Sequence, residues 1–168
     1  NVEFIPVAHS IPESHALAIH TFAGTVLHTG DWKIDPTPLF GPPTDERRLR
    51  ELGDAGVLAL VGDSTNAVRD GRSPSEAAVA KSIAELVKAA KGRVAVTTFA
   101  SNVARLHAVA NPARAAGREV VVVGRAMERV VQVARETGHL DGVQNFRSAD
   151  VYGHLPPDKV LALCTGSQ

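Results

Sequence analysis

The first thirty residues carry apolar positions in short runs, broken by polar residues, that are typical of β-strands. This pattern predicts strands over residues 2–7, 16–22 and 25–29. The last two strands are separated by the turn "FAGT", whose glycine can take the positive φ that a tight hairpin requires. We therefore expect an antiparallel sheet edge at the start of the chain.

A proline-rich loop, "DPTPLFGPP", separates this sheet from a short predicted helix. Thr44 is the expected N-cap, with Asp45 and Glu46 in the first turn. The helix should extend to about Leu52, because two glycines follow shortly afterwards.

From residue 57 the pattern changes to strands alternating with helices, which is typical of parallel βα units. Apolar runs predict strands at 57–61, 93–97, 119–123 and 159–163. Helical spacing predicts a helix beginning at Ser73 or Ser75, one capped by Ser101 and reaching about Ala116, and one near 127–137. The chain is therefore expected to be an α/β protein, with a mostly β part and a doubly wound parallel sheet joined near residues 63–73.

The amino-acid composition argues against several classes of protein. With 44% hydrophobic residues in 168, the chain can form a proper core. Its 18 basic and 18 acidic side chains balance, so it lacks the overall basic excess of many nucleic-acid binders. The apolar runs are too short to span a membrane, and the first residues lack the basic-then-apolar layout of a signal peptide, which predicts a cytoplasmic protein with no membrane partner. A single cysteine, Cys164, excludes an internal disulfide.

The two ends suggest a segment of a longer protein. The chain begins without a methionine, and it stops at "CTGSQ", just after an apolar run. We expect these residues to be part of a larger protein.

His9 and Asp31 are the strongest candidates for chemistry. His9 follows a strand and precedes a serine and a proline that fix the path of the loop. Asp31 follows the hairpin partner of the next strand, so both side chains could meet at one edge of the sheet. Histidine nitrogen and carboxylate oxygen are common zinc ligands. We expect Asp35 only to cap a turn, and Lys33 to lie on the surface.

Five motifs resemble those of a known family. "HSIPES", "TGDWKID", "GDSTNA", "TTFASNVARL" and "CTGSQ" follow one another from His9 to Gln168. In this order they are similar to the β-CASP nucleases of the metallo-β-lactamase superfamily, and most of all to the bacterial ribonuclease J family.

The resemblance implies a fold, a reaction and roles for residues. It implies part of a metallo-β-lactamase αββα fold in residues 1–66, joined to most of a β-CASP domain in residues 67–168. His9 would be a catalytic metal ligand, Asp31 the aspartate that bridges two zinc ions, and Asp63 an acidic residue close to the metal site. The expected activity is RNA hydrolysis from the 5′ end, with some endonuclease action, by a protein that forms homo-oligomers.

The second half offers places for RNA. Ser101 and Asn102 begin a helix directly after a strand, and amides at helix N-termini bind phosphate. Thr165, Gly166 and Ser167 occupy the equivalent place after the last strand, where ligands bind in open α/β sheets. Capping and turn formation are the alternative role for each of these residues.

Part of the family pattern is missing from these 168 residues. The HxHxDH cluster and a late histidine motif do not occur, and in the family both lie outside the stretch that this chain resembles. With His9 and Asp31 alone, the chain is expected to bind zinc weakly and to be inactive by itself. Two alternatives stay open, namely a metallo-β-lactamase-fold hydrolase with another substrate and a non-catalytic nucleotide-binding module.

Overall fold

The computed structural model describes residues 1–166, which divide into two compact units, Asn1–Ala77 and the residues from Ala78 onward. The first contains β1 (Val2–Pro6), β2 (His15–Thr21), β3 (Gly24–His28), α1 (Glu46–Ala55) and β4 (Ala59–Val61). Helix α2 (Glu76–Ala89) begins at the end of the first unit, and the second contains β5 (Val94–Thr97), α3 (Val103–Ala115), β6 (Glu119–Val123), α4 (Arg125–Glu136), β7 (Val160–Cys164) and two short 3₁₀ helices, Ala149–Val151 and Pro157–Lys159.

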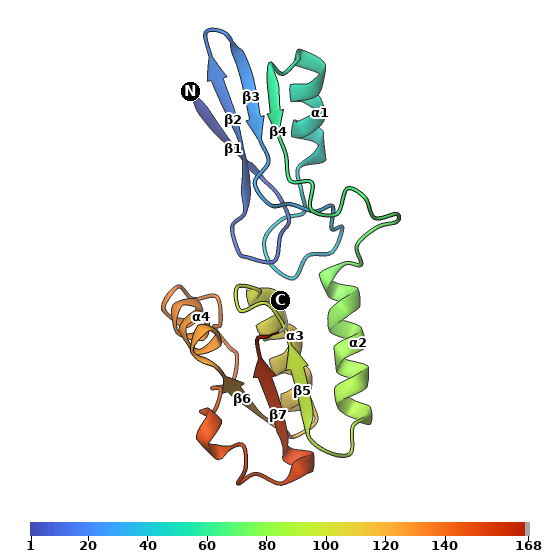
Figure 1. Cartoon of the computed structure of the whole chain (residues 1–168), viewed down its shortest axis with the longest axis vertical. Coiled ribbons are helices and arrows are strands. Elements are labelled where there is room, and N and C mark those ends of the chain that lie inside the picture. Colours follow the sequence, from blue (N-terminus) through green and yellow to red (C-terminus); the bar gives the residue numbers. More distant parts are fainter. Residues whose placement is uncertain (167–168) are drawn as a thin grey trace. The chain divides into compact units, whose positions relative to one another are not determined.

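The first unit is built on a four-stranded sheet in the order β1-β2-β3-β4 (Figure 1). β1, β2 and β3 pair antiparallel, as the sequence pattern predicts, and Gly24 takes a φ of +140° where the hairpin closes. β4 then adds beside β3 in parallel. The loops that follow β3 and β4 therefore leave the sheet at the same edge.

Helix α1 covers one face of this sheet. The buried core contains side chains from the strands together with Leu52, and Leu49 and Trp32 pack against it. Glu3 of β1 accepts two hydrogen bonds from the guanidinium of Arg48, at 2.6 and 2.8 Å, which joins the helix to the sheet. These contacts with Arg48, despite some opposing effect of burial, lower the pKa of Glu3 to about 2.

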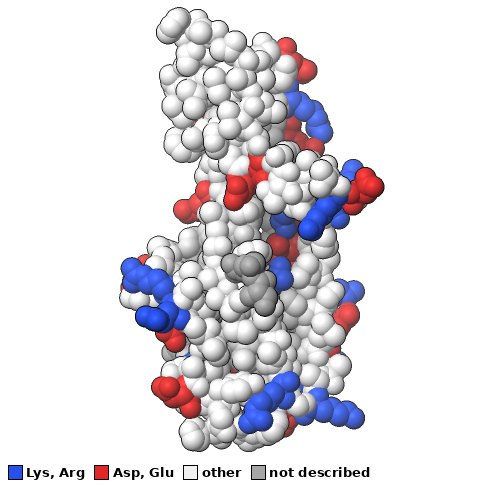
Figure 2. Space-filling model, in the orientation of Figure 1, with Lys and Arg blue, Asp and Glu red and all other residues white. Residues whose placement is uncertain are grey.

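The opposite face of the sheet carries apolar side chains that remain accessible. Side chains alternate between faces along a strand, so Val2 and Phe4 share a face opposite to buried Ile5. The register places Leu17, Ile19 and Val26 on this face as well. Phe4 is 67% exposed and Val61 of β4 is 50% exposed. In Figure 2 the visible surface over β1, β2 and β3 is almost free of charge, whereas charged side chains follow the edge formed by α1.

The second unit is a parallel sheet in the order β5-β7-β6, with α3 and α4 in contact with β6. Its core combines β6 and β7 with the buried face of α3, including Leu106 and Val109. The predicted parallel α/β arrangement is thus confirmed. Cys164 lies at the end of β7, half-buried, with its thiol 3.7 Å from the carbonyl of Val96.

Arg118, which the sequence pattern did not single out, is almost fully buried at 4% exposure. Its guanidinium donates hydrogen bonds to the backbone carbonyls of Ala90, Gly92 and Val160. This one side chain, directly before β6, therefore links β7 with the segment that precedes β5.

Two predicted helix caps are wrong by one residue. Asp45, not Thr44, caps α1, since its carboxylate accepts a hydrogen bond from the Arg48 amide at 2.9 Å. Asn102, not Ser101, caps α3 by accepting from the amide of Arg105. In the first case the buried Thr44 hydroxyl has other partners, the Ala8 amide and the Lys33 carbonyl.

None of the helices in residues 1–166 combines the length and the apolar character needed to cross a membrane. The units divide after Ala77, whereas the predicted domains divide after residue 66. The assignment of residues 1–66 and 67–168 to two domains stays a prediction.

Candidate functional site

The segments that carry His9 and Asp31 are joined through the backbone. Ala8 and Lys33 form an isolated antiparallel bridge, in which the Lys33 amide donates to the Ala8 carbonyl at 2.9 Å. His9 follows Ala8, and Asp31 precedes Lys33 by two residues, so the bridge brings the two candidate segments side by side. The role of His9 and Asp31 as ligands stays a prediction.

His9 is half-buried, and its Nδ1 is inaccessible and has no hydrogen-bond partner among the described residues. A buried imidazole nitrogen without a partner is costly, and a metal ion is one group that would satisfy it. Asp31 is exposed, so its carboxylate is available to a ligand. The donor types fit zinc, but within residues 1–166 no three histidine, cysteine, aspartate or glutamate side chains lie close enough to hold an ion together.

Asp63 lies after β4, and a buried threonine holds its backbone. The hydroxyl of Thr29, at the end of β3, accepts a hydrogen bond from the Asp63 amide at 3.1 Å and donates to the Gly30 carbonyl at 2.8 Å. The Asp63 carboxylate accepts from the hydroxyl and the amide of Thr65. These two bonds, with a smaller effect of nearby His9, hold the pKa of Asp63 below its usual value, although burial acts in the opposite direction.

Thr29 is a residue that the sequence analysis did not identify. It is 6% exposed, and its own amide also donates to the Val61 carbonyl at 2.9 Å. It therefore links the loop that carries Asp31 with the loop that carries Asp63. The only sequence signal was a hydroxyl at the end of an apolar strand, directly before a glycine.

Lys33 is not the surface residue that we expected. Its ammonium lies 3.1 Å from the Asp35 carboxylate and 2.9 Å from that of Glu76, and its side chain is only 21% exposed. Sequence could not indicate this, because Glu76 is 43 residues away.

Asp35 caps a turn as predicted, by accepting from the Thr37 amide at 2.9 Å. It is also 2% exposed and accepts from the Glu76 amide, at the first residue of α2. Burial raises the pKa of Asp35, but the Glu76 and Thr37 amides and the Lys33 ammonium outweigh this effect and lower it.

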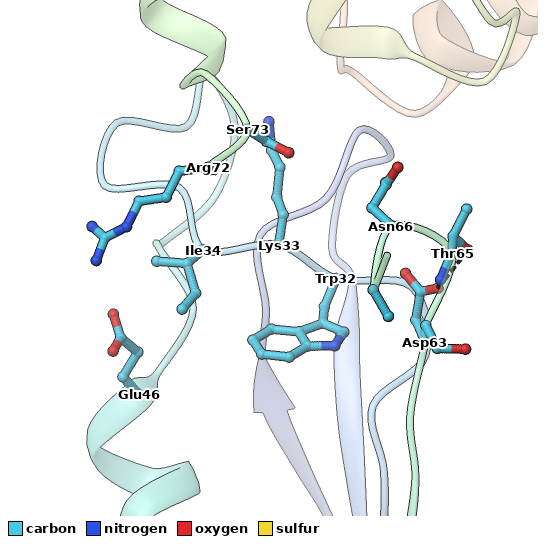
Figure 3. A pocket seen from close by; sticks show the side chains of 11 residues that line it. Trp32, Lys33, Ile34, Glu46, Asp63, Thr65, Asn66, Arg72 and Ser73 are labelled. Carbon is cyan, nitrogen blue, oxygen red and sulfur yellow. Dashed lines mark hydrogen bonds between the residues drawn. The ribbon is translucent and has the colours of Figure 1, made fainter. Parts of the chain in front are cut away.

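A pocket of about 410 Å³ opens beside these loops (Figure 3). The Trp32 indole lies across its middle, with Ile34 and Glu46 on one side and Asp63 and Asn66 on the other. The rest of its lining comes from Lys33, Ser64, Thr65, Ala67, Arg72 and Ser73.

In the second unit the loop that carries Ser101 and Asn102 lies at the same edge of the sheet as Thr165, and these are three of the four residues predicted to contact RNA. The Thr98 amide donates to the Cys164 carbonyl at 3.0 Å, so the loop after β5 lies beside Thr165. Ser101 is exposed, whereas Asn102 is 7% exposed and its side chain caps α3. Ser167, the fourth residue predicted to contact RNA, lies outside the described residues. Direct RNA contact by any of them stays a prediction.

The second half of the chain matches a protein family model. Residues 91–168 match the family model described as the ribonuclease J beta-CASP domain. The full length of the chain is similar to curated proteins named ribonuclease J. It is 56% identical over 168 residues to that of Sinorhizobium meliloti, covering 100% of this chain and 30% of the relative. The ribonuclease J of Mycolicibacterium smegmatis is 46% identical and that of Thermus thermophilus 40%, each over 99% of this chain and 30% and 29% of the relative.

A solved structure shares the fold over almost all of the chain. A protein of unknown function from Enterococcus faecalis V583 matches with a TM-score of 0.57 at 18% identity, covering 99% of this chain and 41% of the other. At this identity the match concerns the fold alone. This chain spans 24–30% of the length of the first curated relatives that it matches.

Proposed function

Because the chain belongs to the ribonuclease J family, we propose that the complete protein is a metal-dependent ribonuclease. The reaction is hydrolysis of RNA phosphodiester bonds, as a 5′ exonuclease with endonuclease activity, in cytoplasmic RNA decay and maturation. The metal is zinc, two ions per site. The 168 residues supply part of the site, and further ligands come from the portion of the protein that corresponds to the uncovered length of its relatives. The predicted homo-oligomer remains a prediction.

The observation that supports this best is the backbone bridge between Ala8 and Lys33. It joins two segments that lie more than twenty residues apart in sequence, and each of them carries a candidate metal ligand. The inaccessible Nδ1 of His9, which lacks a partner in the described part of the chain, adds a donor in need of a ligand.

In the proposed mechanism His9 and Asp31 would hold the metal, which would supply Lewis acidity for hydrolysis of the phosphodiester. Asp63 is ionised at neutral pH, since its usual pKa is already far below 7 and the hydrogen bonds from Thr65 lower it further, and it adds negative charge near His9. Thr29 keeps the loops of Asp31 and Asp63 at a set separation. In this proposal His9 and Asp31 would hold the metal, Asp63 and Thr29 would position the loops around it, and none of them would form a covalent bond to RNA.

The second unit provides the surface that guides the RNA strand. The loop after β5 and Thr165 lie at one edge of the parallel sheet, where ligands of α/β sheets commonly bind. Asn102 orders this edge by capping α3.

The test is Asp31→Ala in the complete gene product. We expect RNA hydrolysis to fall at least 1,000-fold, to within the background of the assay, while the melting temperature changes little, since Asp31 is exposed. Asp54→Ala is the matched control, because Asp54 is an exposed aspartate on α1. Hydrolysis at the wild-type rate by the Asp31 variant would overturn the ligand assignment.

Two further measurements separate the alternatives. RNA labelled at its 5′ end releases labelled mononucleotide first if cleavage starts there. A protein that binds RNA but never cleaves it, with zinc or manganese present, would instead be the non-catalytic module. Cleavage of a β-lactam or ester but not of RNA would identify another hydrolase of the same fold.

A further inference from the structure

The pocket beside Trp32 has the size of a site for one small ligand. Its volume of about 410 Å³ lies near the lower end of the range for small-molecule sites. All of its lining residues belong to the first unit. Trp32 immediately follows Asp31, and Asp63 forms part of the wall, so the pocket adjoins the residues proposed to hold the metal.

The indole of Trp32 is a firmly held surface. Trp32 is half-buried and packs against the apolar core of the first unit. Its backbone lies between Asp31 and the bridged Lys33. The part of the ring that remains accessible extends across the pocket (Figure 3). A fixed aromatic ring beside a nucleic-acid site is suited to stacking on a base, because every base has a flat π face.

The charges of the lining favour a neutral ligand over a phosphate. The lining holds two basic residues, Lys33 and Arg72, and two acidic ones, Glu46 and Asp63. The Lys33 ammonium is already paired with two carboxylates outside the lining, Asp35 and Glu76. An anion would therefore meet little net positive charge in the pocket.

The remaining polar lining can recognise the edge of a neutral heterocycle. Asn66 contributes an amide with both donor and acceptor atoms, and Ser73 and Ser64 contribute hydroxyls. Ile34 and Ala67 supply apolar contact. A flat ring with hydrogen-bonding groups on its edge matches this set.

We propose that this pocket binds one base of the RNA strand, that of the nucleotide next to the scissile phosphate, with Trp32 as the stacking surface and Asn66 as the edge-recognising residue. The proposal deepens the proposed function and rests on it. It assigns to this site a contact with the base, separate from any contact with the phosphate.

The experiment uses the complete gene product carrying Asp31→Ala, so that RNA is bound without cleavage. Fluorescence anisotropy measures the affinity for a short single-stranded RNA and for a series in which one nucleotide at a time is abasic. We expect one abasic position to weaken binding about 5- to 150-fold, the range that base–aromatic stacking provides. In the protein that also carries Trp32→Ala, the same abasic RNA should bind no more weakly than the intact RNA.

Three further variants test whether the effect comes from the aromatic ring of Trp32 and from the pocket. Trp32→Phe retains an aromatic surface and should bind close to normally, and Phe22→Ala removes an aromatic side chain that is fully exposed in the hairpin turn. If Trp32→Ala does not fold, Asn66→Ala serves in its place, because Asn66 is exposed, and it should reduce the preference between bases at that one position. The proposal is overturned if each abasic position lowers the RNA affinity by the same factor with and without Trp32. It is also overturned if Asn66→Ala leaves the base preference unchanged.

This outcome is separate from that of the proposed function. If RNA cleavage depends on metal and on Asp31, but no abasic position lowers the affinity in a way that depends on Trp32, only the assignment of the pocket is contradicted. Cleavage that persists in Asp31→Ala contradicts the proposed metal site, while the abasic series, then run with the metal removed by EDTA so that the RNA stays intact, still tests the pocket.

Discussion

The hydroxyl of Thr29 lies 3.1 Å from the backbone nitrogen of Asp63 and accepts its hydrogen bond. The two residues are 34 positions apart, at the ends of neighbouring parallel strands. One buried side chain thus determines where the loops after β3 and β4 lie relative to each other.

Replacing Thr29 by valine keeps the shape of the side chain but removes this link. We expect the free energy of unfolding to fall by about 1–2 kcal/mol and the metal concentration for half-maximal RNA cleavage to rise about tenfold. Urea unfolding and a metal titration of the complete gene product measure the two effects. Thr29→Ser should restore both, and Thr37→Val, at an exposed threonine, should change neither. Normal metal dependence in Thr29→Val would show that the link does not position the site.

Asp35 predicts how stability depends on pH. Its pKa is lowered below the usual 3.8 in the folded state, so the carboxylate stabilises the fold above that value, and the contribution is lost as pH falls through the lowered pKa. Asp35→Asn should cost about 1–3 kcal/mol at pH 7, with Lys33 still paired to Glu76. The difference between wild type and variant should shrink toward pH 3 in urea unfolding. A difference that grows on acidification would contradict the assigned network.

Arg118 predicts a large effect far from any candidate site. Arg118→Met retains apolar bulk but leaves the carbonyls of Ala90, Gly92 and Val160 without their donor. We expect a loss of about 2–4 kcal/mol in unfolding free energy, measured by urea unfolding of the complete gene product. Arg114→Met is the control, because Arg114 is exposed on α3. Equal losses in the two variants would rule out a special role for the buried guanidinium.

The accessible apolar face of the first sheet predicts dye binding by the 168-residue chain. Contiguous apolar patches of this kind bind hydrophobic dyes, whereas single exposed residues do not. Phe4→Ser should therefore lower the fluorescence of bound anilinonaphthalene sulfonate by about half or more. Phe22→Ser is the control, since Phe22 is exposed but lies in the turn between β2 and β3. Equal loss in both variants would argue against a continuous patch on the face that carries Phe4.

Much of the secondary structure could be predicted because it depends on local pattern. The bounds of β1, β2, β3 and β6 lie within one residue of the expected positions. Apolar runs bounded by turn residues carry enough information for this. The interpretation of Asp35 as a turn cap was confirmed for the same reason, since its partner Thr37 is two residues away.

What could not be predicted depends on partners that are distant in sequence. From its local sequence Lys33 is expected on the surface, and only its ion pair with the distant Glu76 explains its burial. Thr29 is likewise expected only to end a strand, and its role as a link depends on the pairing of β4 with β3. Thr44 and Asp45 are both good caps by residue type, and the choice between them was made by the Ala8 amide and the Lys33 carbonyl, which occupy the Thr44 hydroxyl.

The parallel crossover that joins β4 to β3 has a consequence for local stability. β2 and β3 are joined by a tight turn and β1 by the loop 7–14, so these strands pair locally, whereas β4 must close a longer crossover after β3 and is exposed along all three of its residues. Its amides should exchange with solvent sooner than those of the central hairpin. Detachment of this one strand would break the hydrogen bond between Thr29 and Asp63 and disturb the proposed metal site while the rest of the sheet stays folded.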